Sequence, residues 1–170
     1  MVGGSYKRGE DIPLSQATMV KSILFKICKN QRESEIERNN KREALTHNPN
    51  KLPFRPYYAA NNDKMIVRIM YSYFSAVRDT LSNPDNISFW ELGKTSKVNI
   101  LQTNVGFQAL MKLLGKILEF AKEEEKDKKS FYAIYLEKVK NLDFENESVY
   151  PFTSKSINLL YNDLIEKAFQ

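Results

Sequence analysis

The sequence predicts a mainly α fold, a single-domain bundle of about five helices with a proline-rich connector. Apolar residues recur every three or four positions over 63–81 and 105–124, the spacing of helices with one buried face. Only 6 glycines and 6 prolines occur in 170 residues, which disfavours a turn-dense all-β fold. A chain of this length fits one domain, which we expect over 14–170 behind an extended lead-in, 1–13.

The first predicted helix begins after Ser15, a favourable N-cap residue, and its apolar positions recur at helical spacing as far as residue 30. The continuation over 31–45 is polar on nearly every side. Such a segment is a helix that protrudes from the body, a helix that forms on a partner, or a disordered stretch.

Three prolines within eight residues predict an extended connector over 47–60. Its aromatic residues Phe54, Tyr57 and Tyr58 are expected to hold it against the helical body. In an alternative interpretation the same three side chains are anchors for a partner protein. Asn61 or Asn62 then caps the helix over 63–81.

The only tryptophan, Trp90, follows the helix over 63–81, and we expect it to pack between that helix and the next. Thr103 or Asn104 is expected to cap this next helix, in which Gly106 lets another part of the backbone come close. The remaining helices are expected near 130–142 and 155–169.

Composition excludes several kinds of site. The single cysteine, Cys28, excludes an internal disulfide and favours a reducing compartment. With only one histidine, His47, beside it, the chain has no ligand set for zinc. No Walker loop and no dinucleotide-binding glycine motif occurs. No run of 18 apolar residues and no secretory signal is present, so we expect no membrane partner and a cytoplasmic location. We expect no metal, no cofactor and no catalytic residue.

The net charge of +5 comes from the first third of the chain. Residues 1–60 hold eleven Lys/Arg and six Asp/Glu, whereas residues 61–170 hold fifteen of each. This asymmetry predicts a basic face that contacts DNA phosphates rather than base edges. The alternative is a solvated mixed-charge helix without a ligand. The residues expected to contact phosphate are Lys26, Lys29, Arg32, Arg38, Lys41, Arg42, Lys51 and Arg55.

Arg42 and His47 have the Arg-x4-His spacing that resembles the catalytic motif of HEPN-type helical ribonucleases. The resemblance implies that the two side chains would polarise a scissile phosphate and move a proton. In that family the motif begins a helix and a polar residue follows the arginine. Here Glu43 follows Arg42, and Asn48-Pro49 follows His47. The alternative is a solvated arginine and a helix-terminal histidine.

Four short motifs lie in order along roughly residues 12–120. They are Ser15-Gln16-Ala17-Thr18, Met70-x2-Tyr73-Phe74-x2-Val77 with Trp90 behind it, Lys94-Thr95, and Thr103-x2-Gly106-Phe107-x-Ala109-Leu110. Together they resemble the C-terminal helical half of DGQHR-domain proteins, relatives of the DndB regulator. The resemblance implies a non-enzymatic helical module of a regulator linked to DNA modification or phage defence.

The Asp-Gly-Gln-His-Arg signature of that family does not occur in this sequence. In the family it belongs to an N-terminal, ParB-like half. We therefore expect either the C-terminal part of a longer protein or a free-standing helical subunit. The alternative function is that of a protein-interaction or structural subunit, which docks on a partner or on the missing N-terminal half.

Overall fold

The computed structural model describes residues 14–30, 32–35, 42, 45, 47–48, 50–83, 85–90 and 99–170. Within these ranges the regular structure is helical, apart from one isolated antiparallel bridge between Ser82 and Ser88. The predicted mainly α fold is therefore confirmed. Among the described helices, none combines the length and the apolar character that a bilayer crossing requires.

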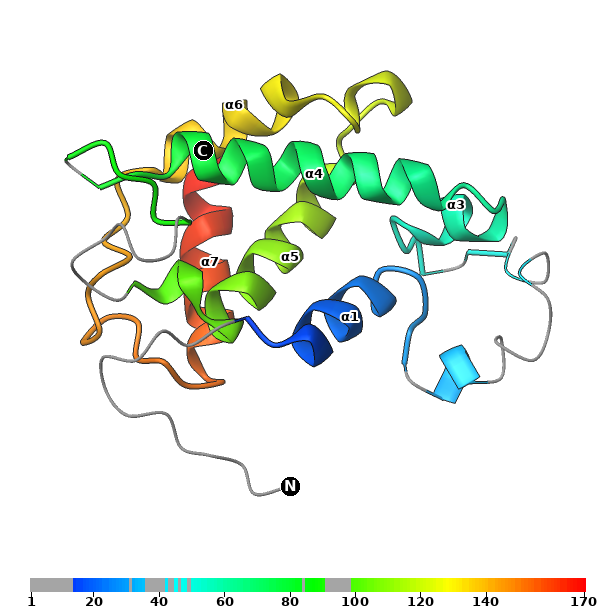
Figure 1. Ribbon diagram of the computed structural model, residues 1–170, viewed down its shortest axis with the longest axis horizontal. Coiled ribbons are helices and arrows are strands. Elements are labelled where there is room, and N and C mark those ends of the chain that lie inside the picture. The colour runs from blue at the N-terminus through cyan, green and yellow to red at the C-terminus, as the bar shows by residue number, and fades with distance from the viewer. Residues whose placement is uncertain are drawn as a thin grey trace.

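Five helices of nine or more residues form the described body (Figure 1). They are α1 (Gln16–Leu24), α4 (Asp63–Thr80), α5 (Asn104–Leu118), α6 (Lys129–Val139) and α7 (Ser156–Ala168). Shorter pieces connect them: α3 (Arg55–Ala59) and the 3₁₀ turns η2 (Ile100–Gln102) and η3 (Glu123–Glu125).

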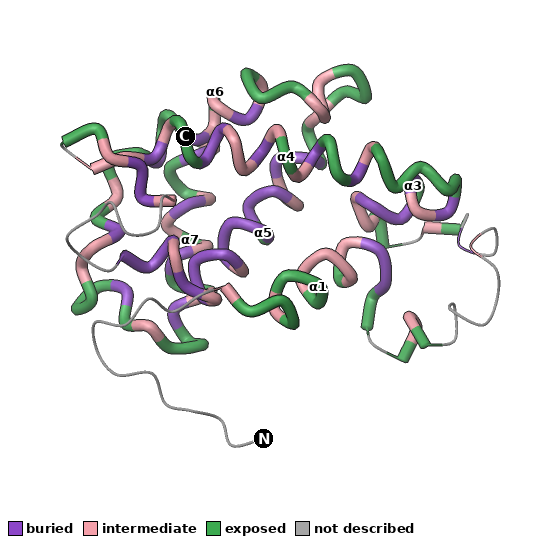
Figure 2. Tube along the Cα trace, in the orientation of Figure 1, coloured by how far each residue is buried: buried purple, intermediate pink, exposed green. Residues whose placement is uncertain are grey.

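Helix α5 lies at the centre of the bundle. Figure 2 shows buried residues along most of its length, and α1, α7 and η2 all pack against it. Helix α4 packs on α6, and the Tyr73 hydroxyl of α4 donates a hydrogen bond of 2.9 Å to the Leu110 carbonyl of α5. The sequence predicts one buried face for α5, but its neighbours enclose several of its faces.

The first turn of α5 is formed as the sequence predicts. Thr103 is the cap: its Oγ1 accepts from the Gly106 N–H at 3.2 Å and donates to the Ile100 carbonyl at 2.7 Å. A Cβ added to Gly106 would lie 2.1 Å from the Ile100 oxygen. Only glycine leaves room for η2 at this distance, so the turn before α5 depends on that residue.

Trp90 lies between α4 and α5, as predicted. Its ring stacks on Phe74 of α4 at 5.0 Å between centroids and on Phe107 of α5 at 6.4 Å. The Phe74 and Phe107 rings are themselves stacked at 5.3 Å. Trp90 is only partly buried, so it lies at the edge of this aromatic cluster and not at its centre.

Tertiary contacts change the extent of some predicted elements. Helix α1 ends at Leu24 and not near residue 30, because the chain turns there and the Lys26 carbonyl accepts from the Phe54 N–H at 2.9 Å. Helix α3 forms inside the connector that the sequence predicts to be extended. Pro56 lies in its first turn, where a missing N–H breaks no helical hydrogen bond. Residues 32–35 are helical, whereas the predictions for 1–13 and for most of 31–45 fall outside the described residues.

Two glycines of α5 provide a matched test of this packing. Gly106→Ala should destabilise the protein by about 3 kcal/mol or more, because its Cβ would meet backbone atoms that cannot move independently. Gly115→Ala should be neutral or stabilise by up to about 1 kcal/mol through helix propensity, since its Cβ would meet the flexible end of Lys26. Urea unfolding of both variants measures the difference, and equal free energies of unfolding would contradict it.

Candidate nucleic-acid interface

The structure describes six of the eight residues predicted to contact phosphate, and it places them in different environments. Lys29, Arg32 and Lys51 are exposed, Lys26 and Arg42 are half-buried, and Arg55 is buried. Arg38 and Lys41 lie outside the described residues. The described six therefore do not form one continuous solvent-facing row.

Arg55 is held inside the protein, with 5% of its surface exposed. Its Nε donates to the carbonyls of His47 at 3.0 Å and Leu45 at 3.2 Å. Its Nη1 donates to the Ile27 carbonyl at 3.3 Å and pairs with Glu33 at 3.1 Å. Arg55 thus ties the connector to the turn after α1, and its guanidinium is not presented to a phosphate.

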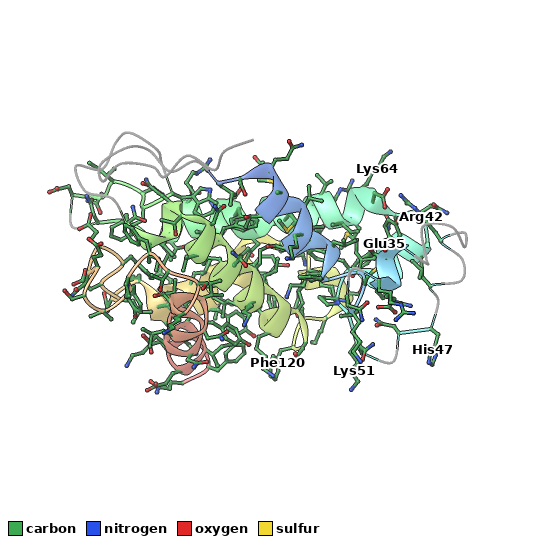
Figure 3. The ribbon with its side chains drawn as sticks, turned by 90° about the horizontal axis from the view of Figure 1, so that it is seen from below. Glu35, Arg42, His47, Lys51, Lys64 and Phe120 are labelled. Carbon is green, nitrogen blue, oxygen red and sulfur yellow. The ribbon has the colours of Figure 1, made fainter. Side chains whose placement is uncertain are left out.

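Arg42 and His47 do not form a catalytic pair in this structure. Arg42 Nη1 lies 2.9 Å from both carboxylate oxygens of Asp63, and the guanidinium covers the Tyr58 ring at 4.0 Å. The His47 side chain is exposed, and its carbonyl accepts from Arg55. In Figure 3 the two side chains lie apart and do not point toward each other. This geometry gives no support to the HEPN-like interpretation.

The aromatic residues of the connector face inward. Phe54 is fully buried, Tyr57 is 8% exposed, and Tyr58 is half-buried beneath Arg42. The Tyr57 hydroxyl donates to Glu123 of η3 at 2.5 Å. These side chains hold the connector to the bundle, as predicted, and leave little surface on which a partner could be anchored.

A cleft opens between the connector and the C-terminal half of α5. It consists of two adjoining hollows of about 650 and 280 Å³, which share residues 50–53, Gly115 and Glu119 as lining. Figure 3 shows Lys51 and Phe120, which both line the larger hollow, projecting on the same side of the molecule. The smaller hollow is lined by four lysines, Lys26, Lys51, Lys112 and Lys116, and its one carboxylate is Glu119.

The Lys26 side chain lies against α5 at Gly115 and lines the smaller hollow. Gly115 has no Cβ there, and an added Cβ would lie 2.6 Å from the Lys26 Nζ. Burial, and then the charge of Lys112, lowers the pKa of Lys26 to about 8, while Glu119 acts in the opposite direction. The Lys26 ammonium is therefore partly desolvated, with repulsion from Lys112 and attraction from Glu119.

Local hydrogen bonds in the connector set the position of Lys51. The Asn48 side chain donates to the Leu52 carbonyl at 2.9 Å and accepts from the Leu52 N–H at 2.8 Å. This closed turn places the backbone of Lys51 at φ 50°, in the left-handed region that residues other than glycine seldom adopt. The strained position brings a lysine to the mouth of both hollows.

Two lysines from α5 complete the cleft, and the sequence prediction did not include them. Lys116 pairs with Glu119 at 2.7 Å, so its charge is balanced. Lys112 donates to Asn158 of α7 at 2.6 Å and has no carboxylate partner in the described part of the chain. Residues 61–170 are neutral overall, so a comparison of net charge between segments does not single out Lys112 and Lys116. Their spacing of four residues on an otherwise apolar helix was the available signal.

Comparisons with models of protein families, with curated proteins and with solved structures found no match to this chain. Across the described residues no three His, Cys, Asp or Glu side chains gather where they could hold a metal ion.

The structural role of Arg55 can be tested by removing its charge. Arg55→Met should cost about 3 kcal/mol of folding free energy, because buried carbonyls from two segments and the Glu33 carboxylate lose their donor. Lys51→Met, at an exposed neighbouring position, should cost less than about 0.5 kcal/mol. Urea unfolding monitored by circular dichroism measures both, and a similar small cost for both variants would disprove the role.

Lys26 should destabilise the fold when it is protonated. Its folded pKa is below the unfolded value of 10.5, so the cost is fully present below pH 8 and declines as the pH rises toward 10.5. Lys26→Met should therefore raise the free energy of unfolding by about 1–3 kcal/mol at pH 7, and by progressively less above pH 8. Unfolding measured between pH 6 and pH 10 tests this, and a gain that did not change with pH would contradict it.

Proposed function

We propose that this protein is a helical binding module that holds the phosphates of a nucleic acid, with DNA as the expected ligand, in the lysine cleft. The observation that carries the proposal is the convergence of four lysines from the turn after α1, the connector and α5 on the smaller hollow of the cleft, which one carboxylate also lines. Phosphate contacts by lysine give affinity that does not depend on base sequence.

The electrostatic state of Lys26 supports an anionic ligand. The ammonium is partly desolvated, and Lys112 repels it, so the free cleft carries unfavourable charge. A phosphate in the cleft would offset the cost of both effects. A polymer is favoured over a single anion because Lys51 lines both of the adjoining hollows, and because the exposed Lys29 and Arg32 follow Lys26 along the chain.

A role in DNA modification or phage defence is a further part of the proposal, and it rests on the resemblance of roughly residues 12–120 alone. In that role the module would position a regulator on DNA without catalysing a reaction. The pairing of Arg42 with Asp63 is consistent with binding rather than phosphate cleavage, because a catalytic Arg42 would have to leave this carboxylate.

Protein docking is the second candidate function, and an exposed apolar pair favours it. Val67 is 66% exposed and Tyr71 is 74% exposed, one helical turn apart on α4. Side chains at this spacing lie next to each other and could anchor a partner helix. Tyr71→Ser should then abolish self-association, or binding of a partner protein, without affecting DNA binding.

DNA binding should depend steeply on salt. Fluorescence anisotropy with labelled single- and double-stranded oligonucleotides should show log affinity falling linearly with log salt concentration. The double variant Lys51→Glu/Lys112→Glu should weaken binding at least tenfold, alike for all sequences, and should reduce the slope by about 2.

The matched control is Lys138→Glu/Lys167→Glu, which changes the net charge equally at exposed positions of α6 and α7 outside the cleft lining. This control should retain most of the wild-type affinity. Equal losses for the two double variants would mean that net charge and not the cleft binds DNA. The absence of binding to either DNA form at low salt would refute the proposed function.

A further inference from the structure

Aromatic rings line the same cleft as the lysines. Phe25 and Tyr161 border the smaller hollow, and Phe120 borders the larger one. Phe25 is 39% exposed and Phe120 is 57% exposed, and Phe120 follows α5, a helix that buries most of its apolar side chains. The cleft therefore presents flat apolar surface beside its cations.

Each of these rings lies beside an ammonium group. The Nζ of Lys21 is 5.7 Å from the centroid of Phe25, that of Lys112 is 5.2 Å from Tyr161, and that of Lys116 is 5.3 Å from Phe120. Cation–π contacts at exposed sites are weak and are readily exchanged for other partners. A ligand that supplied both a flat ring and a phosphate could therefore replace them.

Main-chain hydrogen bonds hold the backbone of two of the residues that carry these rings. Phe25 is the C-cap residue of α1, and its N–H donates to the Lys21 carbonyl at 3.1 Å. Phe120 follows the C-cap of α5, and its N–H donates to the Ile117 carbonyl at 3.0 Å. The Phe120 ring also packs on the ring of Phe169, the C-cap residue of α7, at 5.2 Å between centroids. The rings of Phe25 and Phe120 therefore extend from hydrogen-bonded helix ends beside the cleft.

We propose that the cleft binds single-stranded nucleic acid, with its lysines on the phosphates and Phe25, Phe120 and Tyr161 stacked against unpaired bases. Bases within a duplex are stacked on one another, so the cleft aromatics could not stack on their faces unless the bases were unpaired. A single strand exposes base faces and phosphates together, which is the pairing of groups that this cleft presents. The inference rests on the proposed function and names the form of nucleic acid that it takes.

The test compares three labelled ligands of about 12 nucleotides, a length within the range that single-strand-binding sites cover. They are a single DNA strand, the corresponding duplex, and a strand with the same phosphates in which most positions are abasic. At one salt concentration the single strand should bind about tenfold or more tightly than either of the other two.

Aromatic variants then assign the preference to the cleft. Phe25→Ser/Phe120→Ser should lower affinity for the single strand at least tenfold, leave duplex and abasic binding unchanged, and leave the salt slope unchanged. Phe120→Leu keeps the packing on Phe169 and should lower single-strand affinity less, which separates loss of stacking from loss of folding. Tyr71→Ser removes an exposed ring of α4 outside the cleft lining and should have no effect.

Other outcomes identify which proposal fails. Equal or tighter binding of the duplex, or aromatic variants that bind the single strand normally, would overturn the single-strand inference while salt-dependent DNA binding persisted. Binding of an acidic peptide in place of every oligonucleotide would overturn both this inference and the proposed function.

Discussion

The enclosure of α5 is the constraint on which the described structure depends. Helix α1 packs on one side of it, α7 on another, and the Tyr73 hydroxyl of α4 donates to its Leu110 carbonyl. At its first turn the absence of a Cβ on Gly106 lets η2 lie directly against the helix. The two lysines of α5, Lys112 and Lys116, lie in its C-terminal half, and the lysine cleft forms there between α5 and the connector.

Arg55 and Lys26 show how two basic residues of the same segment can have opposite energetic roles. Both contribute to the positive charge of the first 60 residues. Arg55 is buried with carbonyl and carboxylate acceptors around its guanidinium, so its charge is compensated and holds the connector in place. Lys26 is partly desolvated, and Lys112 repels it. The arginine therefore holds the connector that forms one side of the cleft, and the lysine contributes a partly desolvated positive charge to it.

The sequence predicts most of the helices because their apolar residues recur with the helical period, as in α4, where Ile66, Ile69 and Tyr73 are buried. It does not predict where α1 ends, since that depends on a hydrogen bond between the Lys26 carbonyl and Phe54, 28 positions later. The roles of the site residues depend on the same kind of long-range contact. Arg55 and Lys26 are both basic residues near prolines or helix ends, and only the folded chain distinguishes their environments.

Two unfavourable features at the cleft support the role in binding that we propose for it. Lys51 adopts a left-handed backbone conformation, and Lys26 remains cationic at neutral pH despite its lowered pKa. Neither feature stabilises the free protein, and residues held at such a cost are more frequent at sites where a ligand recovers the energy. An anion would raise the pKa of Lys26 again, so binding above pH 8 would be coupled to proton uptake by this lysine. The other titratable residues that line the smaller hollow are Lys51, Lys112, Lys116, Glu119 and Tyr161. Lys112 opposes protonation of Lys26 in the free cleft, whereas Glu119 favours it. A ligand phosphate would act in the same direction as Glu119, which links the charge state of the site to its occupancy.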